Sequence, residues 1–235
     1  MKIRDQKGRT DQKSGYGRVF NDNKLGALIS RVQATVISNG TELERMLLAR
    51  CNTIADLDQF LQKCENGTQP DGVYVCPKKS LKKSTIIQNL KADNEKVIEP
   101  DLLIFEVSPK QMLCNVVELK DGDTFDTKKV IGEKEHLEHF SKDFGSQISF
   151  KTQYFMCGFN QDDKEELNIG LKGAFKLKEL LTGRELCSML KINYDEIVNL
   201  RKADGEDNLY HFVSELLDIP KVRAEIEKQL KALNQ

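Results

Sequence analysis

Two apolar segments of this sequence carry charged residues at their ends. They read DLLIFEV over residues 101–107 and MLCNVVELK over residues 112–120. Both segments have the length and the apolar character of buried β-strands. If Pro109-Lys110 forms a two-residue turn, the strands pair as a hairpin and Asp101 lies opposite Glu118.

Successive side chains of a strand point to opposite faces, so Glu118 and Lys120 are expected to share one face of the second strand. Val117 and Leu119 are expected to point into the core from the other face. Together with Asp101, this arrangement brings two carboxylates and an ammonium group to one end of the hairpin. Burying such a cluster is costly unless something compensates its charges.

A divalent cation would compensate them. Mg²⁺ is usually held by one or two carboxylates, with water completing its octahedron, next to phosphates. It polarises a phosphoryl oxygen and lowers the pKa of a bound water. A neighbouring lysine can orient that water, help to deprotonate it, or stabilise the developing negative charge. The alternative is that Asp101 and Glu118 are ordinary acidic residues at strand ends, solvated or paired with Lys120 as a surface ion pair of little energetic value.

Pro100-Asp101 followed, after sixteen residues, by Glu118-Leu119-Lys120 resembles the motif of the PD-(D/E)xK nuclease superfamily. The segment ELKDGDTFDTKK, followed by a helix, and the strand YFMCGFN look like the core of type II restriction endonucleases. The motif covers residues 100–120, and the wider similarity runs over about 40–160. The resemblance implies Mg²⁺-dependent hydrolysis of DNA phosphodiesters to 5′ phosphate and 3′ hydroxyl ends. Matched to the motif, Asp101, Glu118 and Lys120 would be catalytic, the two acids as metal ligands.

The superfamily usually adds an acidic residue from a helix before the hairpin, which completes or steadies the metal site. Glu44, in the segment NGTELE, is our candidate for this third metal ligand, and Glu42 is the second choice. The alternative is that Glu44 is a solvated helix residue.

Local clusters of lysine are the predicted DNA contacts. A formal net charge of -1 gives no global attraction to nucleic acid, so binding has to come from local basic patches. Each lysine is a mobile point charge able to displace a counterion from the DNA backbone. The alternative is a solvated basic face. The candidates are Lys78, Lys79, Lys82 and Lys83 in one segment and Lys128 and Lys129 just after the motif.

A predicted helix after the motif carries two histidines and three glutamates, namely His136, His139, Glu133, Glu135 and Glu138. No H-E-x-x-H pattern is present, and the glutamates follow the pattern of a surface. We therefore expect a solvated face here rather than a metal site.

The remaining hydrophobic pattern predicts the elements around the hairpin. Residues 25–51 are expected to form two helices, the second beginning at Thr41, because Ser38-Asn39-Gly40 interrupts the pattern. A capping box from Thr182 to Glu185 predicts the start of another helix. Further helices are expected over about 53–64, 126–143, 205–217 and 219–233, and strands over 73–75 and 149–159.

At 235 residues the chain can bury one large core. The resemblance implies an α/β fold, a restriction-endonuclease-like mixed β-sheet flanked by helices, with a helical C-terminal extension. We expect the nuclease core with N-terminal helices over residues 1–165 and the extension, packed on that core, over residues 166–235, together forming one domain.

The composition is that of a soluble protein, with 39% hydrophobic and 31% charged residues. The sequence lacks an apolar stretch of the roughly 20 residues that span a membrane and the apolar region of a secretory signal. Six cysteines without a C-x-x-C pair make structural zinc unexpected and favour a reducing compartment. We therefore expect a cytoplasmic protein without a membrane partner.

These observations lead to a first hypothesis, a type II restriction endonuclease acting on double-stranded DNA. It would be a homodimer in which each subunit cuts one strand of a palindromic site, and a cognate DNA methyltransferase would be its functional partner. One alternative is a repair, nicking or junction-resolving nuclease of the same superfamily. Another is a non-catalytic DNA-binding regulator that uses the C-terminal helices, with Asp101 and Glu118 merely structural.

Overall fold

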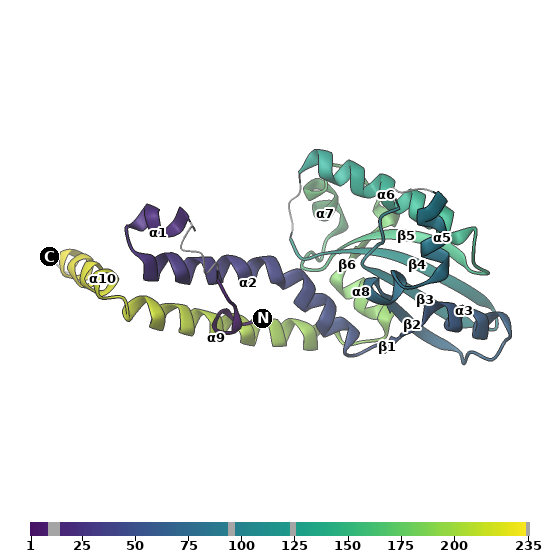
Figure 1. The fold of residues 1–235 in the computed structure, drawn as a ribbon, viewed down its shortest axis with the longest axis horizontal. Coiled ribbons are helices and arrows are strands. Elements are labelled where there is room, and N and C mark those ends of the chain that lie inside the picture. Colours follow the sequence, from purple (N-terminus) through teal and green to yellow (C-terminus); the bar gives the residue numbers. More distant parts are fainter. Residues whose placement is uncertain (9–14, 94–96, 123–125, 234–235) are drawn as a thin grey trace. The chain divides into compact units, whose positions relative to one another are not determined.

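The computed structural model describes residues 1–8, 15–93, 97–122 and 126–233. Its residues group into two compact units, one formed by Met1–Glu42 with Asp195–Gln235 and the other by Leu43–Tyr194 (Figure 1). We call them the helical unit and the sheet unit. The predicted division into residues 1–165 and 166–235 stays a prediction. Residues 123–125 of the ELKDGDTFDTKK segment lie outside the described residues.

The sheet unit is built on a six-stranded sheet in the order β1-β2-β3-β4-β5-β6. The two pairs that β3 makes, with β2 and with β4, are antiparallel, and the other three pairs are parallel. Helices flank this mixed sheet, so the predicted α/β fold is confirmed. The strands are β1 (Asn52–Thr53), β2 (Gly72–Pro77), β3 (Leu102–Ser108), β4 (Gln111–Lys120), β5 (Lys151–Gly158) and β6 (Leu180–Thr182).

The β3–β4 hairpin has the predicted register. Ser108 pairs with Gln111, which leaves Pro109-Lys110 as a two-residue turn, and the same register continues to the other end, where Asp101 and Glu118 follow as the next opposed positions. Neither turn residue has a positive φ. This excludes type II and primed turns, which need a positive φ, and agrees with the preference of proline for the first central position of a type I turn.

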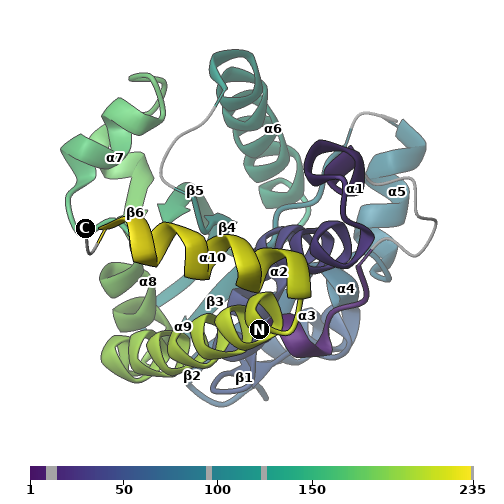
Figure 2. The same ribbon diagram turned by 90° about the vertical axis from the view of Figure 1, so that its left-hand side faces the viewer.

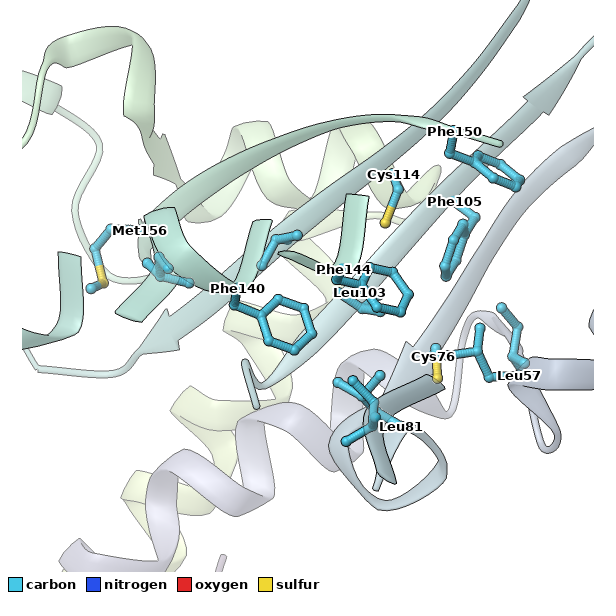
Figure 3. Packing of buried hydrophobic residues seen from close by; sticks show 14 of the residues in the cluster. Leu57, Cys76, Leu81, Leu103, Phe105, Cys114, Phe140, Phe144, Phe150 and Met156 are labelled. Atoms are coloured by element: carbon cyan, nitrogen blue, oxygen red, sulfur yellow. The ribbon is translucent and has the colours of Figure 1, made fainter. Parts of the chain in front are cut away.

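The face of the sheet that carries Glu118 also carries the main hydrophobic cluster. Phe105 of β3 and Cys114 of β4 are fully buried in it. The rings of Phe105 and Phe150 meet edge to face with 5.1 Å between their centroids (Figure 3). Helix α6 (Thr127–Gly145) covers this face with four buried apolar side chains, Val130, Leu137, Phe140 and Phe144.

The opposite face of the sheet is also covered. Helix α8 (Gly183–Leu190) packs against β5 and β6 on the side away from α6 (Figure 2). The prediction that Val117 and Leu119 of β4 point into the core is therefore only partly right. Val117 is fully buried, Leu119 is half-buried, and the main cluster lies on the face of Glu118. Both faces are apolar because helices sandwich the sheet.

Short helices and caps complete the sheet unit. The carboxylate of Asp126 accepts hydrogen bonds from the backbone amides of Lys128 and Lys129 and so caps α6. The predicted capping box of Thr182 and Glu185 is present at the start of α8. The other helices are α3 (Leu57–Glu65), α4 (Lys78–Leu81), α5 (Thr85–Asp93), α7 (Lys164–Gly170) and the 3₁₀ turn η2 (Leu177–Glu179).

The helical unit holds η1 (Ile3–Asp5), α1 (Gly15–Phe20), most of α2 (Asn23–Leu48), most of α9 (Tyr194–Leu217) and α10 (Pro220–Leu233). The predicted break before Thr41 is wrong, because α2 is one helix of 26 residues. Gly40 costs such a helix only about 1 kcal/mol relative to alanine, which the rest of the helix offsets.

Polar contacts join the parts of the helical unit. The guanidinium of Arg31 on α2 pairs with the carboxylate of Glu215 on α9, with Nη1 2.9 Å from Oε1. The side chain of Asn208 accepts a hydrogen bond from the amide of Ile3 and donates one to the carbonyl of Met1. The two long helices and the N-terminal segment are therefore held together by side-chain hydrogen bonds and an ion pair.

None of the helices in the described ranges is long and apolar enough to cross a membrane. All six cysteines are free. Burial raises the pKa of Cys76 to about 12 and that of Cys51 to about 11, so these thiols are neutral at physiological pH.

Candidate active site

Three strand ends of the sheet unit meet around Asp101. The residue after β2, Lys78, donates its backbone amide to the carbonyl of Asp101 at 3.1 Å. The carboxylate of Asp101 accepts a hydrogen bond from the amide of Leu119 at 3.0 Å, which fixes this side chain against β4. The ammonium of Lys78 lies 3.6 Å from the other carboxylate oxygen. Asp101 is thus held by both neighbouring strands.

Glu118 and Lys120 extend from the same face of β4, as predicted. The ammonium Nζ of Lys120 lies 2.9 Å from Oε1 of Glu118 and 2.9 Å from Oε1 of Glu133, a residue of α6. The side chains of Glu118, Lys120 and Glu133 are 18%, 19% and 17% exposed, respectively. Such shielded charges interact much more strongly than a solvated surface pair would. The ion pair of the alternative is therefore present between Glu118 and Lys120, but it is shielded from solvent rather than lying at the surface.

The carboxylates of the site repel one another. Burial raises the pKa of Glu118, and the neighbouring carboxylate of Asp101 raises it further, against the opposing effects of Lys120 and Lys78. Burial acts to lower the pKa of Lys120, but the carboxylates of Glu118 and Glu133 outweigh it and raise this pKa. The lysine is therefore kept as an ammonium ion at neutral pH.

Glu44, near the end of α2, lies beside this cluster. Burial raises its pKa, repulsion from Asp101 adds to the rise, and Lys78 opposes it. The structure thus brings the predicted upstream acid close to Asp101. The second choice, Glu42, lies in the helical unit, with Oε1 3.9 Å from the N-terminal ammonium of Met1. The role of Glu44 as a metal ligand stays a prediction.

The donor atoms of the site suit a magnesium ion with a partial water shell. Within the described ranges, no three His, Cys, Asp or Glu side chains are grouped so that they could hold a metal ion. Asp101 and Glu118 nevertheless offer carboxylate oxygens, and Mg²⁺ is commonly bound through one or two carboxylates and water. A divalent cation would relieve the repulsion that raises the pKa of Glu118. The residues present therefore fit Mg²⁺.

The six predicted DNA-contacting lysines fall into two groups. Lys78 is half-buried and belongs to the site through Asp101. The other five are exposed, in or next to α4 and in the first turn of α6, namely Lys79, Lys82, Lys83, Lys128 and Lys129. Their contacts with DNA stay a prediction.

Glu133 contacts Lys120 at the candidate site, and this contact was not predicted from the sequence. The expectation of a solvated face holds for Glu135, Glu138, His136 and His139, which are exposed, but it is wrong for Glu133. Glu133 lies three residues after Val130 and four before Leu137, which are both buried against the sheet. This i, i+3 and i+4 spacing places Glu133 on the buried face of the helix, and it could have been used to predict that position from the sequence.

Comparisons with known proteins give the family. No protein-family model matches the chain. The type II restriction enzyme HhaII of Haemophilus parahaemolyticus is 50% identical to it over 228 residues, which are 97% of this chain and 98% of that enzyme. With half of the aligned residues identical over nearly the full length of both proteins, the chain belongs to the family of type II restriction enzymes, which are endonucleases.

Proposed function

We propose that this chain is a PD-(D/E)xK restriction endonuclease that cuts double-stranded DNA at a specific sequence with Mg²⁺, leaving 5′ phosphate and 3′ hydroxyl ends. The endonuclease class follows from the 50% identity to a type II restriction enzyme. The observation that carries the finer proposal is the meeting of Asp101, Glu118 and Lys120 at the open end of the β3–β4 hairpin.

Asp101 and Glu118 would hold the metal ion, and Glu44 would complete or steady its site. When bound, Mg²⁺ supplies polarisation of a phosphoryl oxygen and a lower pKa for a water molecule. The amide of Leu119 keeps the carboxylate of Asp101 in place, and the ammonium of Lys120 does the same for Glu118. The carboxylates are thus oriented by the protein before the substrate arrives.

Lys120 would act in its charged form. Of the three roles open to this lysine, removal of a proton from water requires a neutral amine. The carboxylates of Glu118 and Glu133, each 2.9 Å from Nζ of Lys120, favour the ammonium ion instead. This supports the other two roles, in which Lys120 orients the attacking water and stabilises negative charge on the phosphate.

The exposed lysines would bind the DNA backbone around this site. Lys128 and Lys129 begin the helix that follows β4, and Lys79, Lys82 and Lys83 follow β2, whose end lies at Asp101. Phosphate contacts of this kind give affinity and position without reading the sequence. We therefore expect DNA binding to weaken steeply as the salt concentration rises.

The active enzyme would be a homodimer in the cytoplasm, with a cognate DNA methyltransferase as its functional partner. Two-fold symmetry would let each subunit cut one strand of a palindromic site. The helical unit supports this assembly with a row of exposed apolar side chains at helical spacing on α9. These are Leu209, Val213 and Leu217, with Tyr210 beside them. Exposed apolar surface of this kind often marks an interface.

Incubating the purified protein with phage or plasmid DNA, with and without Mg²⁺, tests the function. Discrete fragments that form only with the metal support a restriction enzyme. Nicked circles or cuts at branched structures would favour a repair, nicking or junction-resolving nuclease. Binding without cleavage would favour a DNA-binding regulator. Sequencing the fragment ends then gives the target sequence and the chemistry of the termini.

A matched pair of variants tests the site itself. The chain has a second Pro-Asp pair, Pro70-Asp71, before β2, and Asp71 is exposed. Asp101→Ala should abolish cleavage, whereas Asp71→Ala should cut at the rate of the unaltered protein. Equal activity of the two variants would contradict the assignment of Asp101.

A further inference from the structure

The ammonium of Lys120 contacts two carboxylates that come from different elements. One belongs to Glu118, two residues away on β4, and the other to Glu133 on α6, both at 2.9 Å. A lysine has a flexible four-carbon chain, and a single contact to a neighbour on its own strand leaves that chain free to swing. A second acceptor from a separate element limits this motion.

Helix α6 is well placed to hold such an acceptor still. Its start is capped by Asp126. Val130 and Leu137, on either side of Glu133 in the same face, are 0% and 4% exposed in the main hydrophobic cluster. Side chains carried by packed helices are positioned more accurately than side chains on loops. The carboxylate of Glu133 is therefore fixed by the same packing that builds the core.

The surroundings of Glu133 indicate that its position depends on Lys120. Its second carboxylate oxygen, Oε2, is buried and accepts no hydrogen bond from the residues that the structure describes. Burying a carboxylate is costly unless a partner compensates it, and the ammonium of Lys120 is that partner here. Glu135, two residues further along the helix, is exposed and carries no such cost.

We propose that Glu133 is a positioning residue, which holds the ammonium of Lys120 at the active site from α6. The inference rests on the proposed nuclease function. Glu118 has two tasks in that function, because it would also hold the metal ion. Glu133 contacts Lys120 from α6 and would have this one task. It would keep the lysine aimed at the phosphate whatever Glu118 binds.

The test measures kcat, KM and DNA binding for four single variants. Glu133→Ala removes the acceptor, and we expect kcat to fall about 10- to 100-fold with KM little changed, as is typical when a supporting residue is lost. Glu133→Gln keeps an acceptor oxygen at the same distance along the side chain and should recover most of the rate. Glu135→Ala removes an equal charge from the same helix and should leave kcat unchanged. Binding of DNA by metal-free Glu133→Ala should match that of the unaltered protein.

The fourth variant, Lys120→Ala, separates the possible failures. If Lys120→Ala is inactive and Glu133→Ala retains full kcat, the positioning role is overturned and the proposed nuclease function stands. If Lys120→Ala itself cuts at the normal rate, the assignment of Lys120 falls, and the role of Glu133 falls with it. Should Glu133→Ala fail to fold, Glu133→Asp decides the question, because it keeps the charge and withdraws it by one methylene group. A reduced kcat supports the proposal, and a normal kcat overturns it.

Discussion

The sheet unit and the helical unit differ in the kinds of contact that stabilise each of them internally. The sheet unit buries apolar side chains on both faces of its sheet, including Phe105 on the face that α6 covers and Val117 on the other, which are fully buried. In the helical unit, the buried hydrophobic residues among those described are only Ile3, Leu28, Ile197 and Ile219. Hydrogen bonds and ion pairs, such as that between Arg31 and Glu215, also join its helices.

This difference fits the two tasks proposed above, catalysis by the sheet unit and association with a second copy of the chain by the helical unit. The candidate catalytic residues all lie in the sheet unit, where close packing on neighbouring strands and α6 fixes their geometry. Most of the exposed large apolar side chains among the described residues belong to the helical unit, with Ile37 74% and Tyr210 75% exposed. A tightly packed core suits chemistry, which tolerates little displacement, and an exposed apolar surface suits association with another chain.

The largest expected effect is on catalysis by the sheet unit. Asp101→Ala, Glu118→Ala or Lys120→Ala should each lower the rate of DNA cleavage by about 10³-fold or more, since removing a group that acts on the transition state costs this much. Urea unfolding should show that each variant still folds. Normal cleavage by any one of them would remove that residue from the site.

The next effect is on the stability of the sheet unit. Phe105→Ala should lower the free energy of unfolding by about 3–5 kcal/mol, because it leaves a cavity among closely packed rings. Leu230→Ala, at an exposed position of α10 in the helical unit, is the control and should change that free energy by less than about 0.5 kcal/mol. Comparable losses for the two variants in urea titrations would contradict the contrast between the units.

The next prediction concerns the proposed homodimer, which a single substitution should dissociate. Leu209→Asp puts a charge on the exposed apolar row of α9, and burying that charge between subunits is unfavourable. We expect sedimentation velocity to show a dimer for the unaltered protein and a monomer for the variant at micromolar concentration. A monomeric unaltered protein, or a variant that remains fully dimeric, would rule out this part of α9 as the interface.

The smallest effect concerns the helix that was expected to break. Gly40 lies within α2, and an added Cβ would meet no described atom within 4 Å. Gly40→Ala should therefore raise the free energy of unfolding by up to about 1 kcal/mol. Differential scanning calorimetry would detect this as a small increase in Tm, and a decrease would mean that the position does not tolerate a side chain.

The sequence allowed the hairpin and the cluster of Asp101, Glu118 and Lys120 at its end to be predicted because both depend on local rules. A two-residue turn sets the register, and strand alternation then puts Asp101 opposite Glu118 and puts Lys120 on the same face as Glu118. The similarity to a type II restriction enzyme confirms the prediction of a restriction endonuclease, and the six-stranded sheet confirms the prediction of a mixed α/β fold.

Contacts between distant segments could not be predicted in this way. Lys78 reads as one of several lysines in a basic segment, and its place beside Asp101 depends on the pairing of β2 with β3. The contact between Glu133 and Lys120 likewise requires α6 to pack on the sheet. The prediction of a helix break before Thr41 was wrong because a local signal was given too much weight. The penalty of Gly40 is small compared with the stability of the whole helix.

The tight turn at Pro109-Lys110 is a suitable site for attaching a label to this enzyme. Both residues are exposed, and the seven residues of β3 separate them from Asp101. At about 3.3 Å per residue, that is roughly 23 Å from the reacting groups. Because five of the six native cysteines are buried, a cysteine introduced at Lys110 would accept a fluorophore or a surface tether selectively. Single molecules could then be followed on DNA with the label well away from the chemistry.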